Sequence, residues 1–202
     1  MLIAHLVPGY FVAAKSQPNW KPEWSRNQQV ALWVAALGST VVPDLDVIYN
    51  VLFRGFFNHS TLWTHSLFPY LGLLFFWWLL WCIGRWPYLQ TMIGMLTLGG
   101  ISHLVLDVVS HSTPLLYPFS LQMFGAPSSR VLEGGLWAYL TDPIFLMEPF
   151  LITLAVGHWI VHHRKATTKL KKIVLIGLVS GLAVFTFTFL LLLPALQYFI
   201  AT

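Results

Sequence analysis

The segment SHLVLDVVSH, residues 102–111, carries two imidazoles and one carboxylate within an otherwise apolar stretch. His103 and Asp107 are four residues apart, so on an α-helix they share one face, with about 6 Å of rise between them. His111 continues that face with a drift of roughly 40° per step. A histidine and an aspartate related in this way can together bind one metal ion.

Two further short segments supply the same kinds of side chain. PDLD holds Asp44 and Asp46 at an expected helix end, where irregular backbone lets both carboxylates point the same way. NHSTLWTHS adds the imidazoles of His59 and His65. A mixture of imidazole nitrogens and carboxylate oxygens suits zinc, manganese or iron better than calcium, which prefers oxygen ligands alone. The sequence therefore predicts a divalent metal site, with zinc as the first choice and manganese or iron as alternatives.

The composition indicates that these polar residues lie in a membrane protein. Hydrophobic residues make up 57% of the chain, charged residues only 9%, and the mean hydropathy is +0.71. A soluble domain carries roughly 25% charged residues to cover its surface. Every apolar stretch except the first is long enough to cross ~30 Å of hydrocarbon as a helix. The stretches cover residues 2–14, 30–53, 66–83, 89–110, 143–161 and 173–200.

The expected fold is all-α, a polytopic transmembrane helical bundle with about five to six membrane helices. No internal repeat or linker divides the chain, so residues 1–202 are expected to form a single integral-membrane domain. Its metal-site core covers about residues 1–120. Membrane helices at 143–161 and 173–200 follow, after one long loop at 113–136 that is rich in proline and glycine.

The basic residues predict how this bundle is oriented. In a six-helix arrangement nine of the eleven lysines and arginines fall on one side, and Arg54 and Arg130 fall on the other. Cytoplasmic loops carry an excess of Lys and Arg, so the first side is expected to face the cytoplasm and the His/Asp residues the extracytoplasmic side. The nine are Lys15, Lys21, Arg26, Arg85, Arg164, Lys165, Lys169, Lys171 and Lys172.

The clustering of ionisable groups is a stronger signal than any one of them. Each costs about 2.5 to 3.5 kcal/mol inside a membrane, yet at least five are expected at one depth from four separate segments. A lone buried histidine is more often a packing residue than a ligand, and PDLD alone equally fits a helix end with a cap. A bound cation accounts for the whole group, because it neutralises the carboxylates and satisfies the imidazoles in one site.

Several motifs of the first 120 residues are similar to those of a known family. The chain resembles the LexA-binding, inner-membrane-associated metal-dependent hydrolases, the YdjM-like family. Between His59 and Thr64 this chain is one residue longer than the family's His-Arg-Gly-x-Thr-His-Ser run and lacks its arginine. The matching features are His5 with Gly9, GSTVVPDLD at 38–46, Thr64-His65-Ser66, and GGISHLVLDVVSHSTPLLYPFS at 99–120.

This resemblance implies an integral protein of a bacterial or archaeal cytoplasmic (inner) membrane with a metal-dependent hydrolase site. The metal ligands that it implies, carried over by position, are His5, Asp44, Asp46, His59, His65, His103 and Asp107.

The function expected from these residues is metal-assisted hydrolysis. One or two ions held by the Asp and His side chains would lower the pKa of a bound water, with Asp46 and His111 as catalytic groups that manage its proton. A site near the outer interface favours an amphiphile, so the expected substrate is a phosphate ester or lipid-linked molecule and the expected partner is membrane lipid.

Other classes of function use the same residues. A transporter or a proton- or ion-coupled membrane protein could use the His/Asp cluster as a relay or ion site, although the paired repeats of many transporters are missing here. A structural protein could use a bound metal as a staple. A serine hydrolase built on Ser66, Ser102 or Ser110 lacks the usual G-x-S-x-G turn. No nucleic-acid partner is expected, because no basic stripe lies outside the apolar stretches.

Overall fold

The computed structural model describes residues 4–55, 63–125, 147–163, 176–177 and 180. The chain divides into two compact units, one mainly Ala4–Pro127 and the other mainly Ser128–Thr202. In the second unit the described helix is α8, Met147–His163. The first unit contains α1 Leu6–Ser16, η1 Gln17–Asn19, α2 Arg26–Ser39, η2 Val42–Asp44, α3 Leu45–Tyr49, η3 Asn50–Arg54, η4 Trp63–His65, α4 Phe68–Ile83 and α5 Pro87–Ser110.

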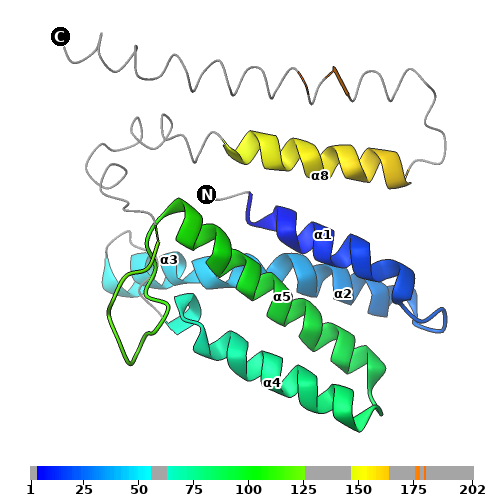
Figure 1. Cartoon of the computed structure of the whole chain (residues 1–202), viewed down its shortest axis with the longest axis horizontal. Helices are drawn as coiled ribbons and strands as arrows, with labels where there is room; N and C mark the ends of the chain where they lie inside the picture. Colours follow the sequence, from blue (N-terminus) through cyan, green and yellow to red (C-terminus); the bar gives the residue numbers. More distant parts are fainter. Residues whose placement is uncertain (1–3, 56–62, 126–146, 164–175, 178–179, 181–202) are drawn as a thin grey trace. The chain divides into compact units, whose positions relative to one another are not determined.

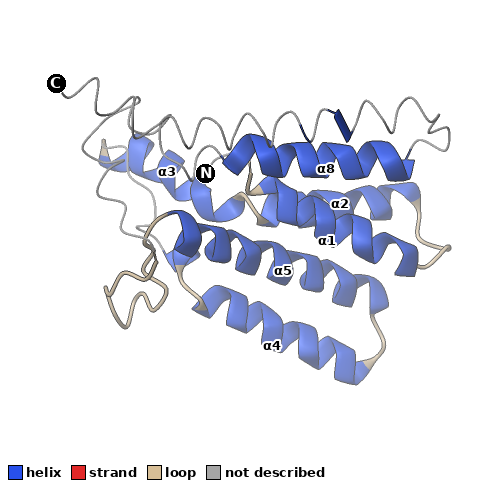
Figure 2. Cartoon of the chain, turned by 45° about the horizontal axis from the view of Figure 1, so that its top comes forward, coloured by secondary structure: helices blue, strands red, loops and turns tan. Residues whose placement is uncertain are grey.

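The all-α prediction is confirmed for the described part of the chain. Figure 2 shows helices joined by loops there, with no strand, and the only β-type pairing in those residues is an isolated bridge between Thr113 and Phe124. One described helix, α5, is long and apolar enough to cross a membrane by itself. The helix α4 and residues Phe150–Ile160 are apolar but shorter. The polytopic arrangement with five to six membrane helices stays a prediction.

Helix α5 is the central element of the first unit. It packs against α1, α2 and α4, and α1 also packs against α2 (Figure 1). The α4–α5 hairpin turns at Gly84, whose φ of 67° lies in the left-handed region that glycine adopts without strain, and whose N–H donates to the Leu80 carbonyl. On α4 the large apolar side chains of Phe75, Trp78 and Trp81 are exposed.

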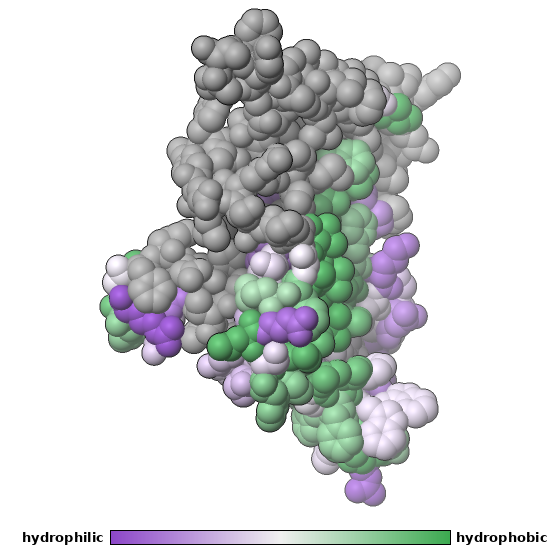
Figure 3. All heavy atoms as spheres, turned by 60° about the vertical axis from the view of Figure 1, so that its left-hand side comes forward, coloured by the Kyte–Doolittle hydropathy of each residue, from purple (hydrophilic) through white to green (hydrophobic). Residues whose placement is uncertain are grey.

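Exposed apolar side chains of this kind are numerous on the described surface. Trp81 is 63% exposed, and Figure 3 shows a broad band of apolar surface over the described part of one face. Contiguous apolar surface on this scale is costly in water and favourable against lipid. The surface of the first unit is therefore suited to a bilayer.

The apolar stretch at residues 30–53 is not one continuous helix, as its length had suggested. The α-helix α2 ends at Ser39, and the chain continues through the short helices η2, α3 and η3. Pro43 explains part of the break, because it lacks an N–H and disfavours helical geometry at the preceding residue. Ser39 and Thr40 add to it by donating their hydroxyls to the carbonyls of Ala36 and Leu37.

Two adjacent glycines let α5 approach both of its neighbours. A Cβ atom at Gly99 would overlap the Ser39 side chain on α2, and one at Gly100 would overlap the ring of Tyr70 on α4. The Tyr70 hydroxyl donates to the Thr64 carbonyl at 2.8 Å. The packing at Gly100 therefore extends through Tyr70 to the backbone just before His65.

We predict that Gly100→Ala destabilises the protein by about 1 to 3 kcal/mol, because the added methyl group must displace a buried aromatic ring. Gly72→Ala on α4 is the matched control, since nothing lies within 4 Å of its new methyl group. The control should be neutral or slightly stabilising, because alanine favours helix more than glycine does. Thermal unfolding in detergent measures both variants, and equal midpoints for the two would contradict the packing described.

Candidate metal centre

Four segments of the first unit bring their histidines and aspartates to one buried cluster. His5 lies just before α1, Asp44 in η2, His65 in η4, and His103 and Asp107 in the last two turns of α5. The side chains of these residues are at most 1% exposed, except Asp44 at 16%. The cluster is therefore almost closed to solvent, and Asp44 lies on its accessible side.

The tautomer of His103 is fixed by a backbone carbonyl. Its Nδ1 lies 2.7 Å from the Thr40 carbonyl oxygen, which can only accept, so Nδ1 carries the hydrogen and donates. In the neutral ring Nε2 then has a lone pair, and this atom faces Asp107 Oδ2 at 3.1 Å and Asp44 Oδ1 at 3.6 Å. A lone pair directed at two carboxylate oxygens is unfavourable, so this position favours either a proton on Nε2 or a metal cation among the three atoms.

Four distances between imidazole nitrogens and carboxylate oxygens are close to the spacing of ligands around a tetrahedral ion. His65 Nε2 lies 3.7 Å from Asp44 Oδ1 and 3.5 Å from Asp107 Oδ2, close to the His103 values of 3.6 and 3.1 Å. Ligands about 2.0 to 2.1 Å from a tetrahedral zinc ion are about 3.3 Å from one another. These four imidazole-to-carboxylate distances are therefore close to tetrahedral spacing, and a mixture of nitrogen and oxygen donors suits zinc.

Buried atoms without hydrogen bonds support the same interpretation. Within the described residues, His5 Nε2, His103 Nε2 and both carboxylate oxygens of Asp107 are buried and form no hydrogen bond of acceptable geometry. Unsatisfied buried polar groups are rare and costly in proteins. Groups of three possible ligands that meet the spacing for a metal are His5, His103 and Asp107, and also Asp44, His65 and His103.

Asp46 lies on the other side of the His65 ring from Asp44. Its Oδ2 is 3.2 Å from His65 Nδ1, whereas Asp44 Oδ1 faces Nε2. The two carboxylates of the PDLD segment therefore contact different nitrogens of the same His65 ring. A carboxylate on the remote nitrogen of a metal-binding histidine orients the ring and increases its basicity.

His5 and His111 flank the cluster. The His5 ring lies between Asp44 and Asp107, with Nδ1 3.3 Å from Asp44 Oδ2 and Nε2 3.3 Å from Asp107 Oδ1. His111 Nε2 lies 2.9 Å from Asp107 Oδ1, and its side chain is 15% exposed. His111 is therefore both in contact with the cluster and accessible from outside.

The carboxylates make this position favourable for positive charge. Burial by itself lowers the pKa of His65, but the carboxylates of Asp44 and Asp46 outweigh that effect and raise the pKa to about 9. Without a metal, this raised pKa keeps the His65 imidazole protonated at neutral pH. A divalent cation bound at the cluster would replace that proton and balance the charge of the carboxylates.

The structure thus brings together six of the seven predicted ligands, namely His5, Asp44, Asp46, His65, His103 and Asp107. The seventh, His59, and most of the predicted membrane stretch 173–200 lie outside the described residues. The three serines considered as nucleophiles donate instead to backbone carbonyls, Ser66 to Trp63, Ser102 to Gly99 and Ser110 to Asp107.

Three supporting residues were missed by the sequence analysis. Thr40 fixes the His103 ring through its carbonyl, and Tyr70 holds the backbone before His65. Thr113, in the loop after α5, is fully buried and its hydroxyl donates to the His65 carbonyl at 3.4 Å. Every residue has a backbone carbonyl, so the role of this group cannot be predicted from residue types. The two adjacent glycines before His103 were the one sequence feature that indicated close packing.

Comparison with known proteins identifies the family to which this chain belongs. No curated protein and no solved structure matches the chain. The family model described as YdjM inner membrane protein matches residues 1–192, which include every residue of the cluster. The chain therefore belongs to the YdjM inner membrane protein family.

Proposed function

We propose that this protein is a membrane-embedded, metal-dependent hydrolase that acts on a phosphate ester or lipid-linked substrate. The observation that carries the proposal is the lone pair of His103 Nε2, fixed by Thr40 and facing the carboxylates of Asp44 and Asp107. Membership of a family of inner membrane proteins supports a location in the inner membrane. A zinc ion at this cluster would supply a water of lowered pKa and an electrophile for the scissile group.

The residues divide into holding and orienting roles. We assign the ion to His65, His103, Asp44 and Asp107, whose imidazole-to-carboxylate distances are 3.1 to 3.7 Å. The carboxylate of Asp46 orients His65 through Nδ1, as the Thr40 carbonyl orients His103. This assigns Asp46 a positioning role in place of the ligand role expected from the sequence.

His111 is the group best situated to move a proton. It contacts Asp107 Oδ1 from the accessible edge of the cluster, so it can take a proton from the buried side and release it to solvent. His5 contacts Oδ2 of Asp44 and Oδ1 of Asp107. This leaves the other oxygen of each carboxylate directed at His65 and His103.

The position of the cluster favours an interfacial substrate. Asp107 lies three residues before the end of α5, about 5 Å along the axis, and His103 lies one turn further in. A site at this depth can receive the polar linkage of an amphiphile whose chains remain in the bilayer. We infer that the site opens on the extracytoplasmic side, because the basic residues are concentrated on the opposite side of the chain.

We predict that Asp44→Asn lowers turnover at least about 100-fold, because the amide keeps the shape of the side chain but removes the charge that the ion requires. The assay incubates detergent-purified protein and zinc with phospholipids, lipid pyrophosphates and soluble phosphate esters, and reads products by mass spectrometry. Glu23→Gln is the matched control, since Glu23 is an exposed carboxylate outside the cluster. Wild-type protein that forms no product from any substrate but moves an ion across proteoliposomes, dependent on Asp44, would support the transporter instead.

A second prediction separates the orienting carboxylate from the holding ones. Asp46→Asn should weaken metal binding by about 10- to 100-fold, the usual cost of losing an outer partner of a ligand, and excess zinc should restore its activity. Asp107→Asn should not be restored, because it removes a ligand atom. Zinc titration followed by activity measures both variants. If excess zinc rescues neither or both, the division of roles is wrong.

A further inference from the structure

Residues 112–125, the site loop, follow α5 and form an apolar segment at the end of the first unit that carries the metal cluster. The site loop contains no charged residue and no histidine. Figures 1 and 2 both show it projecting beyond the end of α5, away from the helices. Phe119 and Leu121 are 82% and 77% exposed, the two highest values among the large apolar side chains of the described residues. A loop with such side chains is costly in water.

The site loop is attached directly to the metal centre. The hydroxyl of Thr113 donates to the His65 carbonyl at 3.4 Å. The N–H of Leu67, two residues after His65, donates to the Leu115 carbonyl at 2.9 Å. Thr113 and Phe124 pair through two backbone hydrogen bonds, so the loop also closes on itself. Whatever surrounds the loop therefore lies beside the cluster.

Most backbone N–H groups of the loop are satisfied within the protein. Seven of the twelve residues from Thr113 to Phe124 donate their N–H to a protein oxygen, and two more are prolines, which have no N–H. A solvated loop has no such need, because water accepts from its N–H groups. Lipid cannot accept, so a segment that enters a bilayer satisfies these groups internally. The seven donors are Thr113, Leu115, Tyr117, Phe119, Ser120, Gln122 and Phe124.

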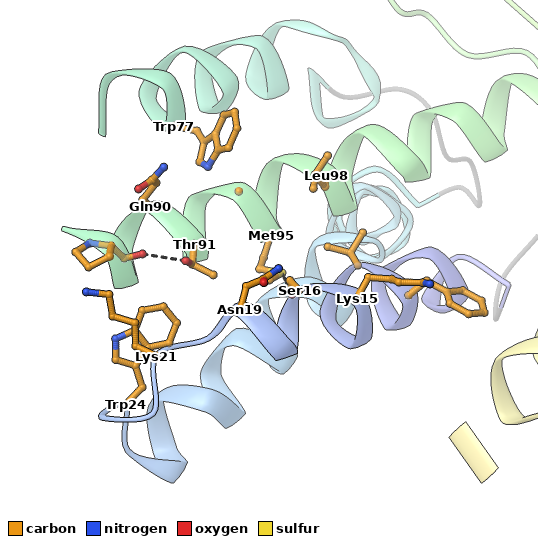
Figure 4. A pocket seen from close by; sticks show the side chains of 14 residues that line it. Lys15, Ser16, Asn19, Lys21, Trp24, Trp77, Gln90, Thr91, Met95 and Leu98 are labelled. Carbon is orange, nitrogen blue, oxygen red and sulfur yellow. Dashed lines mark hydrogen bonds between the residues drawn. The ribbon is translucent and has the colours of Figure 1, made fainter. Parts of the chain in front are cut away.

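The position of the loop along α5 fits a bilayer interface. Helix α5 has 24 residues and is about 36 Å long, so it can begin at one face of ~30 Å of hydrocarbon and end at the other. Figure 4 shows Lys15, Asn19, Lys21 and Gln90 around the first half of α5. That end is suited to water and headgroups, whereas the uncharged site loop at the other end is suited to acyl chains.

The loop also continues the apolar surface of α4. The ring of Phe119 packs edge-on against that of Phe68, the first residue of α4, with 5.0 Å between the ring centroids. Phe68 is itself 39% exposed, and α4 goes on to present Phe75, Trp78 and Trp81. No charged residue occurs in α4 or in the site loop. Lipid that covers α4 therefore meets the site loop as well.

We propose that the site loop inserts Phe119 and Leu121 into the acyl-chain boundary of the leaflet beside the metal centre. Apolar side chains of interfacial segments reach about 5 to 10 Å into this boundary, which leaves the irregular backbone of the loop outside the hydrocarbon core. One consequence rests on the proposed function. The inserted loop holds lipid next to the cluster, so hydrolysis of a lipid depends on it and hydrolysis of a soluble phosphate ester does not.

Fluorescence quenching in vesicles of phosphatidylethanolamine and phosphatidylglycerol measures the insertion. The full-length protein with Cys82→Ala carries Leu121→Cys labelled with bimane, and the matched control carries Glu23→Cys, because Glu23 is 67% exposed near the other end of the bundle. Lipids with a nitroxide high on the acyl chain should quench the probe at position 121 at least about twofold more than the probe at position 23. Aqueous iodide should quench the probe at position 23 more.

Two results would overturn the proposal. Quenching of the probe at position 121 by iodide and not by the nitroxide lipid would show a solvated loop. Protection of that probe from both quenchers would show that protein covers the loop, either a second copy or another part of this chain.

A second measurement separates this inference from the proposed function. Phe119→Ser with Leu121→Ser should lower hydrolysis of phospholipid in vesicles at least about tenfold, and leave bound zinc and hydrolysis of a soluble phosphate ester unchanged. The matched control is Leu71→Ser with Phe75→Ser, which removes the same residue types from exposed positions on α4 and should retain both activities. An equal loss on both substrates would contradict a role in lipid access. If wild type hydrolyses neither substrate, the proposed function is wrong, and the quenching result alone decides whether the loop inserts.

Discussion

The hydrogen bond from His103 Nδ1 to the Thr40 carbonyl is the interaction on which the rest of the cluster depends. Because a carbonyl oxygen can only accept, the bond leaves the lone pair of a neutral His103 on Nε2, in the middle of the cluster. That atom then faces Asp44 and Asp107 with nothing to donate. Either a proton on Nε2 or a metal cation among these atoms would relieve that arrangement, and the proposed function places a metal ion there.

Close packing of α5 against its neighbours makes this hydrogen bond possible. Thr40 follows directly after α2, so its carbonyl reaches the ring only if α2 and α5 lie close together. The absence of a side chain at Gly99 allows that approach, and Gly100 allows the same on the α4 side. Helix association in membranes commonly relies on small residues at the contact, since lipid provides no hydrophobic drive between helices.

Much of the site could be predicted from residue types, because its chemistry lies in side chains. The i, i+4 relation of His103 and Asp107, the two carboxylates of PDLD and the imidazole of His65 all meet in the structure. The separate positions of Asp44 and Asp46 could not be predicted, since they depend on how η2 and α3 direct each carboxylate around one ring. The roles of Thr40 and Thr113 were also hidden, because they depend on long-range packing.

The sequence was less informative about the helices themselves. Apolar length located α4 and α5 well, because a helix in lipid needs a continuous run of apolar residues. It was misleading for residues 30–53, where Pro43 and the hydroxyls of Ser39 and Thr40 end α2 early. That break is useful to the site, because the short helix η2 that follows it carries Asp44 into the cluster.

X-ray absorption spectroscopy of the purified protein at the zinc edge tests the central claim most directly, because it reports the atoms bound to the ion without a substrate. The account predicts a shell of about four nitrogen and oxygen atoms at about 2.0 to 2.1 Å, with the outer-shell scattering of two imidazoles. His103→Ala should remove one imidazole from that signal. A protein that retains no metal, or a shell with no imidazole scattering, would contradict the account.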